Sequence, residues 1–379
     1  MTFGAAISEH PLATQATGEV VGEVLERVGE APDLAVLFVT PPHLGLMAEI
    51  AETVRTVLRP GTLLGAAAST VVGGPREVEE GPAISLWAGR VGPVEPLPLE
   101  TQRLNGGWAL TGLPAQDDDA PPRTLLLLTD PFTIPVDGVL DRLRAKAPGL
   151  QVVGGMASAA RGPGGNRLVL DDAVYDRGAV GVLLGSSVVS GTVVSQGCRP
   201  VGQAYVVTRA TADVIHDLAG VPALDRLREI VGGLTEADRA LVQEGLHIGQ
   251  VIDEQQDTFG PGDFLVRNVR GADAEAGDIA IGGVAPVGST VQFHVRDAES
   301  ADEDLRHLLA GQDGRAALVF TCSGRGSHLF GEPDHDARLV HDQVARGAVA
   351  GMSCAGELGP IGGRNFVHTF TASVVLFDG

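Results

Sequence analysis

The stretch GMSCAGELGPIGGRNFVHTFTASVVLF, residues 351–377, decides how the rest of the chain is interpreted. It holds five glycines within thirteen residues, and polar side chains of several kinds stand between them. Glycine lets a backbone turn, or approach a neighbour, where a Cβ would clash. A turn alone needs one or two glycines, so this density with varied polar groups indicates a site. The stretch ends in an apolar, strand-like run, Ala372–Phe377.

The same plan occurs twice earlier in the chain. An apolar run is followed by apolar residues at helical spacing, then by a glycine-rich turn and a further apolar strand. Thr40 and Gly65 are as far apart in the sequence as Thr129 and Gly154, which indicates an internal repeat. In a third copy the spacing is longer because residues 324–333 form an added loop. Only this copy carries the varied polar set.

The repeat predicts an α/β fold of βαβ-type units whose helices pack on mixed sheets. We expect two domains. Residues 1–197 would hold two repeat copies, and residues 198–379 would hold different, inserted material followed by the third copy. Residues 105–122, with three consecutive aspartates, are interpreted as a solvated loop inside the first domain.

Composition excludes several classes of partner. The formal net charge is −21 and the pI is near 4.8, which opposes binding to nucleic acid or to an anionic membrane surface. The three cysteines are far apart and no CxxC occurs, which fits a reducing cytoplasm and gives no zinc site. The N-terminus lacks a signal peptide pattern. No nucleotide cofactor is expected, because Gly324-Arg325-Gly326 lacks both the Walker lysine and the Rossmann spacing.

The candidate ligand-binding residues are mostly in the third copy's glycine-rich stretch. A guanidinium such as Arg364 binds carboxylates and a carboxylate such as Glu357 binds ammonium groups, so both in one pocket would suit a zwitterion such as a free amino acid. Alternatively, the two pair with each other and hold the turn. Asn365 adds a donor and an acceptor and favours the pocket. The ligand-binding set is Cys354, Glu357, Arg364, Asn365, His368 and the glycine-flanked Arg325.

Catalysis and metal binding are less well supported by the pattern. Cys354 could be a nucleophile activated by His368 or His335, which would make the protein a thiol-dependent hydrolase or transferase. The nearby Glu357 would instead raise the thiol pKa, so we expect no catalytic residue. The His/Asp-rich patch of residues 328–341 has the wrong spacing for one metal-binding helix face, and its carboxylates suit a helix N-terminus. We therefore expect no metal.

Several motifs together resemble the FIST (F-box and intracellular signal transduction) family. They are Gly197–Pro200, Gln292–Asp297, Cys322–Gly326, Cys354–Pro360 and Gly362–Phe366 with His368. The resemblance implies FIST N-terminal and C-terminal domains with the division given above. It also implies a sensory module that recognises small molecules such as amino acids. We expect a stand-alone cytoplasmic sensor that signals through a separate protein. A protein-interaction platform without a small ligand is the further alternative.

Overall fold

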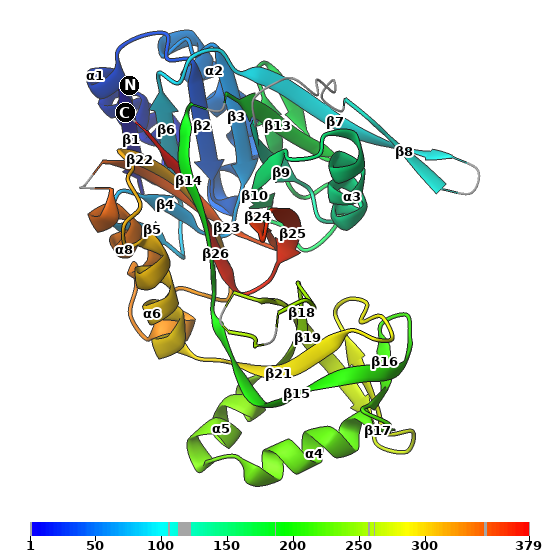
Figure 1. The fold of residues 1–379 in the computed structure, drawn as a ribbon. Coiled ribbons are helices and arrows are strands. Elements are labelled where there is room, and N and C mark those ends of the chain that lie inside the picture. Colours follow the sequence, from blue (N-terminus) through cyan, green and yellow to red (C-terminus); the bar gives the residue numbers. More distant parts are fainter. Residues whose placement is uncertain are drawn as a thin grey trace. The chain divides into compact units, whose positions relative to one another are not determined.

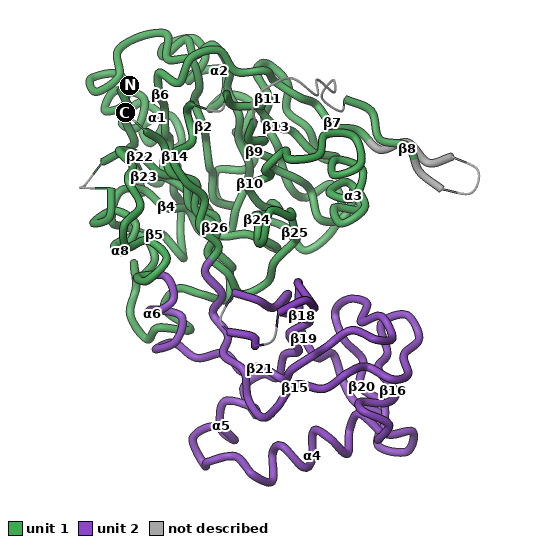
Figure 2. The backbone as a smooth tube through the Cα atoms, viewed as in Figure 1, with its two compact units in different colours: residues 1–194, 306–379 green, residues 195–305 purple. Residues whose placement is uncertain are grey.

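The computed structural model of this chain describes residues 2–104, 107–112, 123–185, 187–256, 258–260, 262–344 and 347–378 (Figure 1). The chain forms two compact units, which Figure 2 shows in different colours. Unit 1 comprises residues 1–194 and 306–379, and unit 2 comprises residues 195–305. Within the described part of the chain, no helix has both the length and the apolar character needed to span a bilayer.

The three repeat copies in unit 1 share one plan. A first strand is followed by a helix and a parallel second strand, and a closing strand pairs antiparallel with the first. The elements are β2 (Leu34–Val39), α2 (Met47–Val57), β3 (Thr62–Ala67) and β6 (Ile84–Gly89) in copy 1; β9 (Thr124–Thr129), α3 (Val136–Lys146), β10 (Gln151–Met156) and β13 (Ala179–Leu184) in copy 2; and β22 (Ala316–Cys322), α8 (His335–Gln343), β23 (Ala348–Cys354) and β26 (Thr371–Phe377) in copy 3. The predicted α/β fold of repeated units on mixed sheets is confirmed.

Between its second and closing strands, each copy has a hairpin that joins the sheet of another copy. The hairpins are β4 (Val71–Gly73) with β5 (Arg76–Val78), β11 (Leu168–Leu170) with β12 (Ala173–Tyr175), and β24 (Glu357–Ile361) with β25 (Arg364–His368). In each pairing the first hairpin strand is antiparallel to its partner: β4 to β23 of copy 3, β11 to β3 of copy 1, and β24 to β10 of copy 2. The exchange is cyclic, so every copy completes the sheet of one neighbour.

The repeated glycines explain how these hairpins pair. Gly65, Gly154 and Gly351 occupy the same place in β3, β10 and β23, and each is paired with a hairpin residue of another copy. A Cβ on them would lie 2.8, 2.0 and 2.1 Å from a carbonyl oxygen of the parallel neighbouring strand. The sequence predicted turns at these glycines. They instead lie inside strands, where close approach of two backbones excludes a side chain.

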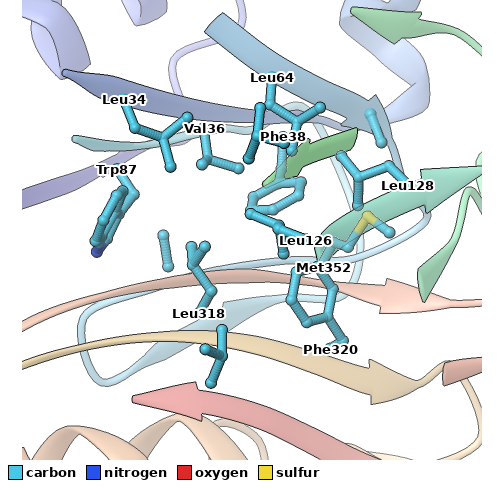
Figure 3. Close-up of a cluster of buried hydrophobic side chains, with 14 of the residues drawn as sticks. Leu34, Val36, Phe38, Leu64, Trp87, Leu126, Leu128, Leu318, Phe320 and Met352 are labelled. Atoms are coloured by element: carbon cyan, nitrogen blue, oxygen red, sulfur yellow. The ribbon is translucent and has the colours of Figure 1, made fainter. Parts of the chain in front are cut away.

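Three sheets of unit 1 enclose one apolar core. In strand order they are β1-β6-β2-β3-β11-β12, β25-β24-β10-β9-β13-β7-β8 and β14-β26-β22-β23-β4-β5, with β1 at Phe3–Ser8, β7 at Glu95–Leu104, β8 at Gly107–Thr111 and β14 at Val189–Gln196. Side chains from all three sheets point toward one another in Figure 3: Leu34, Val36, Phe38, Leu64, Trp87, Leu126, Leu128, Leu318, Phe320 and Met352. The first strands are continuous apolar runs because both of their faces are covered.

Helices cover the outer faces of the sheets. The apolar faces of α1 (Ala13–Val28) and α2 pack on the first sheet, and that of α3 packs on the second. Short helical turns, η1 (Pro41–Leu46) and α7 (Ser327–Phe330), follow the first strands of copies 1 and 3. The predicted solvated loop at 105–122 differs in part, because β8 pairs with β7 there; residues 113–122 lie outside the described part of the chain.

Unit 2 is an antiparallel sheet in the order β15-β21-β18-β19-β20-β16-β17, with two helices and an apolar core of its own. Its elements are β15 (Cys198–Thr211), β16 (Val214–Leu218), β17 (Val221–Pro222), α4 (Ala223–Gly233), α5 (Glu236–Glu244), β18 (Leu246–Val251), β19 (Phe264–Asp273), β20 (Asp278–Ile281) and β21 (Thr290–Arg296). The helix α6 (Ala298–Leu309) continues from unit 2 into unit 1. Thr235 caps α5 by accepting a hydrogen bond from the Asp238 N–H.

The boundaries of the two compact units differ from those of the expected domains 1–197 and 198–379. The third copy belongs to unit 1 with the first two copies, and unit 2 contains only the inserted material. The physical reason is the exchange of hairpins, because β24 completes the copy 2 sheet and β4 completes the copy 3 sheet.

Candidate functional site

A buried carboxyl group in copy 3 stands where the other copies carry aliphatic side chains. In each exchanged pairing, one hairpin residue lies opposite the residue that follows the shared glycine. Leu168 lies opposite Ala66, Glu357 opposite Gly155, and Val71 opposite Met352. Leu168, Glu357 and Val71 are all completely buried. Burying an ionisable group is costly unless it is paired or neutral, so Glu357 calls for an explanation that its counterparts do not.

Glu357 is only partly satisfied by its neighbours. Its Oε2 accepts hydrogen bonds from Thr371, at 2.8 Å from Oγ1 and 3.2 Å from the backbone nitrogen. Its Oε1 is buried and has no hydrogen-bond partner among the described residues. Burial raises the pKa of Glu357 to about 8, although hydrogen bonds from Thr371 and the charge of Arg325 lower it. The side chain is therefore mostly protonated at neutral pH.

Arg325 is a buried cation whose charge acts on Glu357. It is only 2% exposed and forms two hydrogen bonds to Asp336, from Nε to Oδ2 at 2.6 Å and from Nη2 to Oδ1 at 2.9 Å. Its Cζ lies 5.2 Å from the centroid of the Phe330 ring. Its Nη1 is buried and has no partner among the described residues. One donor of a fully buried guanidinium is thus available.

Asp336 holds Arg325 in place through a wider set of hydrogen bonds. Thr321 Oγ1 donates to Oδ2 at 2.9 Å, and His335 Nδ1 lies 3.0 Å from Oδ1. Burial alone would raise the pKa of Asp336, but the Arg325 charge and these contacts hold it below its usual range. The His335 ring also stacks on Phe330 at a centroid distance of 3.5 Å. The loop that follows β22 is therefore fixed around Arg325.

Copy 1 contributes a further carboxyl group to the surroundings of Asp336. Glu77, on β5, is buried, and its Oε1 accepts a hydrogen bond from the Ala337 N–H at 2.8 Å. Burial first, and then the charge of Asp336, raise the pKa of Glu77 to about 7. We call the residues Glu77, Cys322, Arg325, His335, Asp336, Cys354, Glu357, His368 and Thr371 the copy 3 polar cluster.

The two thiols of this cluster are poor nucleophiles. Cys354 is completely buried in the core, and burial together with the Glu357 charge raises its pKa well above the ordinary thiol value. Burial also raises the pKa of Cys322 to about 12. A nucleophilic cysteine needs an accessible thiolate, and the environment here favours the thiol. The geometry therefore weighs against the thiol-dependent hydrolase or transferase considered from the sequence.

The structure does not bring Arg364 to Glu357. In the β24–β25 hairpin Arg364 pairs with Ile361 at the turn, whereas Glu357 pairs with His368 at the other end. The two positions are separated by about 13 Å along the strand, at roughly 3.3 Å per residue. Arg364 is exposed, with its Cζ 5.2 Å from the Phe366 ring centroid. Proximity in sequence suggested a pair that the extended hairpin separates.

The remaining predicted residues have separate positions. Asn365 ties the hairpin to the start of β10, because its Oδ1 accepts from the Val152 N–H at 2.9 Å and its Nδ2 donates to the Leu150 oxygen at 2.7 Å. His368 is buried beside Glu357 across the hairpin, and its Nε2 lies 3.0 Å from the Gly359 oxygen. Of the predicted set, Cys354, Glu357, His368 and Arg325 belong to one cluster, whereas Arg364 and Asn365 lie apart.

Sequence reasoning missed Glu77, Asp336 and Thr371 as members of the cluster. Asp336 was considered within the patch of residues 328–341, whose carboxylates were interpreted as suited to a helix N-terminus, and Glu77 and Thr371 were assigned no role. The signal that could have identified Asp336 is the loop added in copy 3, since an insertion that carries both Arg325 and an acidic segment can form its own ion pair.

The fold and the site define an α/β protein of three hairpin-exchanging copies with a buried polar cluster in one copy. The chain belongs to the FIST family: it matches the FIST N domain over residues 33–221 and the FIST C domain over residues 223–360. FIST domains are associated with signal transduction and the sensing of small ligands.

Mycobacterial relatives share the whole length of the chain. An uncharacterized protein of Mycobacterium bovis is 42% identical over 385 residues, covering 100% of this chain and 99% of the relative. An uncharacterized protein of Mycobacterium tuberculosis is 41% identical over 387 residues, covering 100% of both chains. The similarity therefore includes unit 2 as well as the three copies.

Proposed function

We propose that this protein senses a small zwitterion, such as a free amino acid, at the copy 3 polar cluster, and that a separate cytoplasmic protein responds to the bound state. The observation that carries the proposal is a pair of buried atoms without hydrogen-bond partners among the described residues, Glu357 Oε1 and Arg325 Nη1. One belongs to a carboxyl group and the other to a guanidinium, whose charge lowers the pKa of that carboxyl group. An ammonium group and a carboxylate on one ligand match them.

Because both groups are buried, ligand binding must be coupled to a conformational change. Ligand entry requires the segment 323–334, which carries Arg325 and Phe330, to move away from the cluster and to close again. A ligand shifts such an equilibrium only if it binds one conformation better than the other. A zwitterion would do so, because its two charges are matched only when Arg325 and Glu357 are both in place.

Proton release provides a specific test of this proposal. Because the pKa of Glu357 is raised to about 8, an ammonium ion that binds its carboxylate must displace a proton at neutral pH. We expect affinity for the ligand to increase as the pH rises towards 8, and calorimetry in buffers of different ionisation enthalpy to show proton release. A screen of free amino acids by thermal shift would identify the ligand, since saturation at a hundredfold excess over the dissociation constant adds about 2.7 kcal/mol of stability.

Two variants complete the experiment. Glu357→Gln keeps the shape and the acceptor for Thr371 but removes the charge, so binding should weaken and lose its pH dependence. Glu49→Gln, an exposed carboxyl on α2, is the matched control and should bind like the wild type. If Glu357→Gln binds with unchanged affinity and unchanged proton release, or if no free amino acid stabilises the wild type, the proposal is wrong.

A further inference from the structure

A cleft in copy 2 has the features of a second binding site. Its volume is about 1030 Å³, and it lies between the loop that joins β9 to α3, the segment 174–179, and part of β7. Phe132, Tyr175 and Arg167 are among the side chains that line it. None of the residues that line this cleft belongs to the copy 3 polar cluster.

One buried carboxylate holds three walls of the cleft together. Asp130 is completely buried; its Oδ2 accepts from Thr133 Oγ1 at 2.7 Å and its Oδ1 accepts from Asn166 Nδ2 at 2.9 Å. Thr133 Oγ1 in turn accepts from the Gly178 N–H at 2.9 Å. The β9–α3 loop, the segment before Arg167 and the start of β13 are thus fixed relative to one another, as a preorganised binding site requires.

The other two copies lack this arrangement. In all three copies, the first six residues of the first strand pair with the second strand. The next residue along the chain is Thr40 in copy 1, Asp130 in copy 2 and Cys322 in copy 3. Thr40 uses its hydroxyl locally, on the backbone of Gly81 and Ala83. In copy 3 the Cys322 thiol bonds to backbone groups, at Gly324 and Phe370. Among the described residues it is the copy 2 residue, Asp130, that bonds to side chains of two segments, those of Thr133 and Asn166. This side-chain network at the cleft is therefore specific to copy 2.

The cleft offers an apolar wall that includes aromatic rings. Phe132 is 41% exposed, which is unusual for a large apolar side chain next to a buried strand end. Tyr175 is half-buried, and Ile134 and Leu99, which also line the cleft, are buried. A flat hydrocarbon ring would remove this surface from water and could stack on an aromatic side chain.

The cleft also offers one guanidinium that forms no direct ion pair with the described residues. Arg167 is half-buried, and its Nη1 donates to the backbone oxygens of Gly164 at 2.8 Å and Asn166 at 2.7 Å. Among the described residues no carboxylate lies within ion-pair distance of it. Asp176, which also lines the cleft, pairs with Arg177 at 2.9 Å and interacts with the Arg167 charge only at longer range. In a chain with a net charge of −21, an anchored guanidinium facing a cleft is suited to an incoming anion.

We propose that this cleft binds an organic anion with an aromatic ring, of the aryl carboxylate class. The carboxylate pairs with Arg167, and the ring packs against Phe132 and Tyr175. The site is independent of the copy 3 polar cluster, so the two proposals can fail separately.

Benzoate is the probe that tests this proposal, with benzamide as its neutral analogue and acetate as its ringless analogue. Binding to the full chain is followed by saturation-transfer NMR and titration. We expect benzoate to bind at least about tenfold more tightly than either analogue, because benzamide cannot form the charge-assisted hydrogen bond and acetate lacks the ring and its apolar contact. Arg167→Gln removes the ion pair and Phe132→Ser removes apolar contact, and each should weaken benzoate binding by about the same factor. Glu357→Gln should leave it unchanged.

Arg144→Gln is the matched control, because Arg144 is an exposed arginine on α3 that pairs with Asp141. Thermal unfolding of each variant shows whether it is folded. If Arg167→Gln is unstable, Phe132→Ser still tests the proposal, because Phe132 is exposed and its replacement should not disturb the core. The proposal is overturned if benzoate does not bind the wild type, if benzamide binds equally well, or if both cleft variants bind like Arg144→Gln.

Discussion

The free-energy cost of burying Glu357 can be judged against the equivalent residues of the other two copies. Val71 and Leu168 fill the equivalent places with apolar side chains, and all three positions are completely buried. A buried carboxyl group costs free energy relative to such aliphatic residues, even when it is protonated and partly hydrogen-bonded. Functional sites are the usual places where a chain departs from its own local rule.

The raised pKa of Glu357 predicts how stability depends on pH. The folded pKa is about 8 and the ordinary value is 4.5, so the folded protein keeps a proton that the unfolded chain loses between them. The unfolding free energy should therefore fall as the pH rises from 4.5 towards 8, with a limiting slope of about 1.4 kcal/mol per pH unit for this group. Glu77, raised to about 7, adds its own contribution below that pH.

Urea unfolding at a series of pH values measures this effect. Glu357→Gln cannot titrate, so its stability should decline less steeply with pH than that of the wild type. Glu49→Gln, on the surface of α2, should follow the wild-type curve. Parallel curves for the wild type and Glu357→Gln would show that the Glu357 carboxyl titrates normally.

At the scale of elements, local patterns predicted the strands and helices but not the pairing of the hairpins. The run at Leu34–Val39 is apolar throughout and Thr124–Thr129 contains four consecutive leucines, and prolines stand close to both ends of each run, so their burial could be inferred. Nothing in the sequence of β4 or β24 specifies that its partner lies in another copy. The same limitation affected the site, where Arg325 and Glu357 come together only because copy 3 strands and the added loop fold around them.

The glycines shared by β3, β10 and β23 allow a prediction about the exchanged pairing. A Cβ at Gly351 would lie 2.1 Å from the Val319 oxygen and 3.0 Å from the Val319 Cβ, so β22 and β23 would have to separate. Gly351→Ala should therefore lose at least about 1–3 kcal/mol of unfolding free energy, the usual cost of overpacking. Urea unfolding gives the value.

Gly22→Ala is the matched control for this prediction. Gly22 is inside α1, and no atom lies within 4 Å of the place its Cβ would take. Alanine there should leave stability unchanged or increase it by about 0.5–1 kcal/mol, because it favours the helix. Equal effects of the two substitutions would mean that the close approach of β22 and β23 does not constrain residue 351.

At the scale of the whole molecule, the exchange of hairpins makes the three copies depend on one another. Each hairpin completes the sheet of a neighbouring copy, and the common core takes side chains from all three sheets. Removing any copy would leave an unpaired strand edge and an open core. Unit 2, by contrast, has a sheet and an apolar core formed from its own residues.

This dependence predicts how fragments of the chain behave, and Trp87 provides the signal. Its ring lies 4.8 Å from that of Phe377 and its Nε1 donates to the Ala348 oxygen at 3.3 Å, both from copy 3. In a Trp108→Phe background, fragment 1–197 should show solvent-exposed Trp87 emission and no cooperative unfolding. Adding fragment 306–379 should shift the emission to the blue, because it returns the missing strands and core side chains.

Fragment 195–305 should unfold cooperatively alone. Native emission and a cooperative transition in fragment 1–197 by itself would instead show that the first two copies fold as an independent domain, as the sequence division suggested.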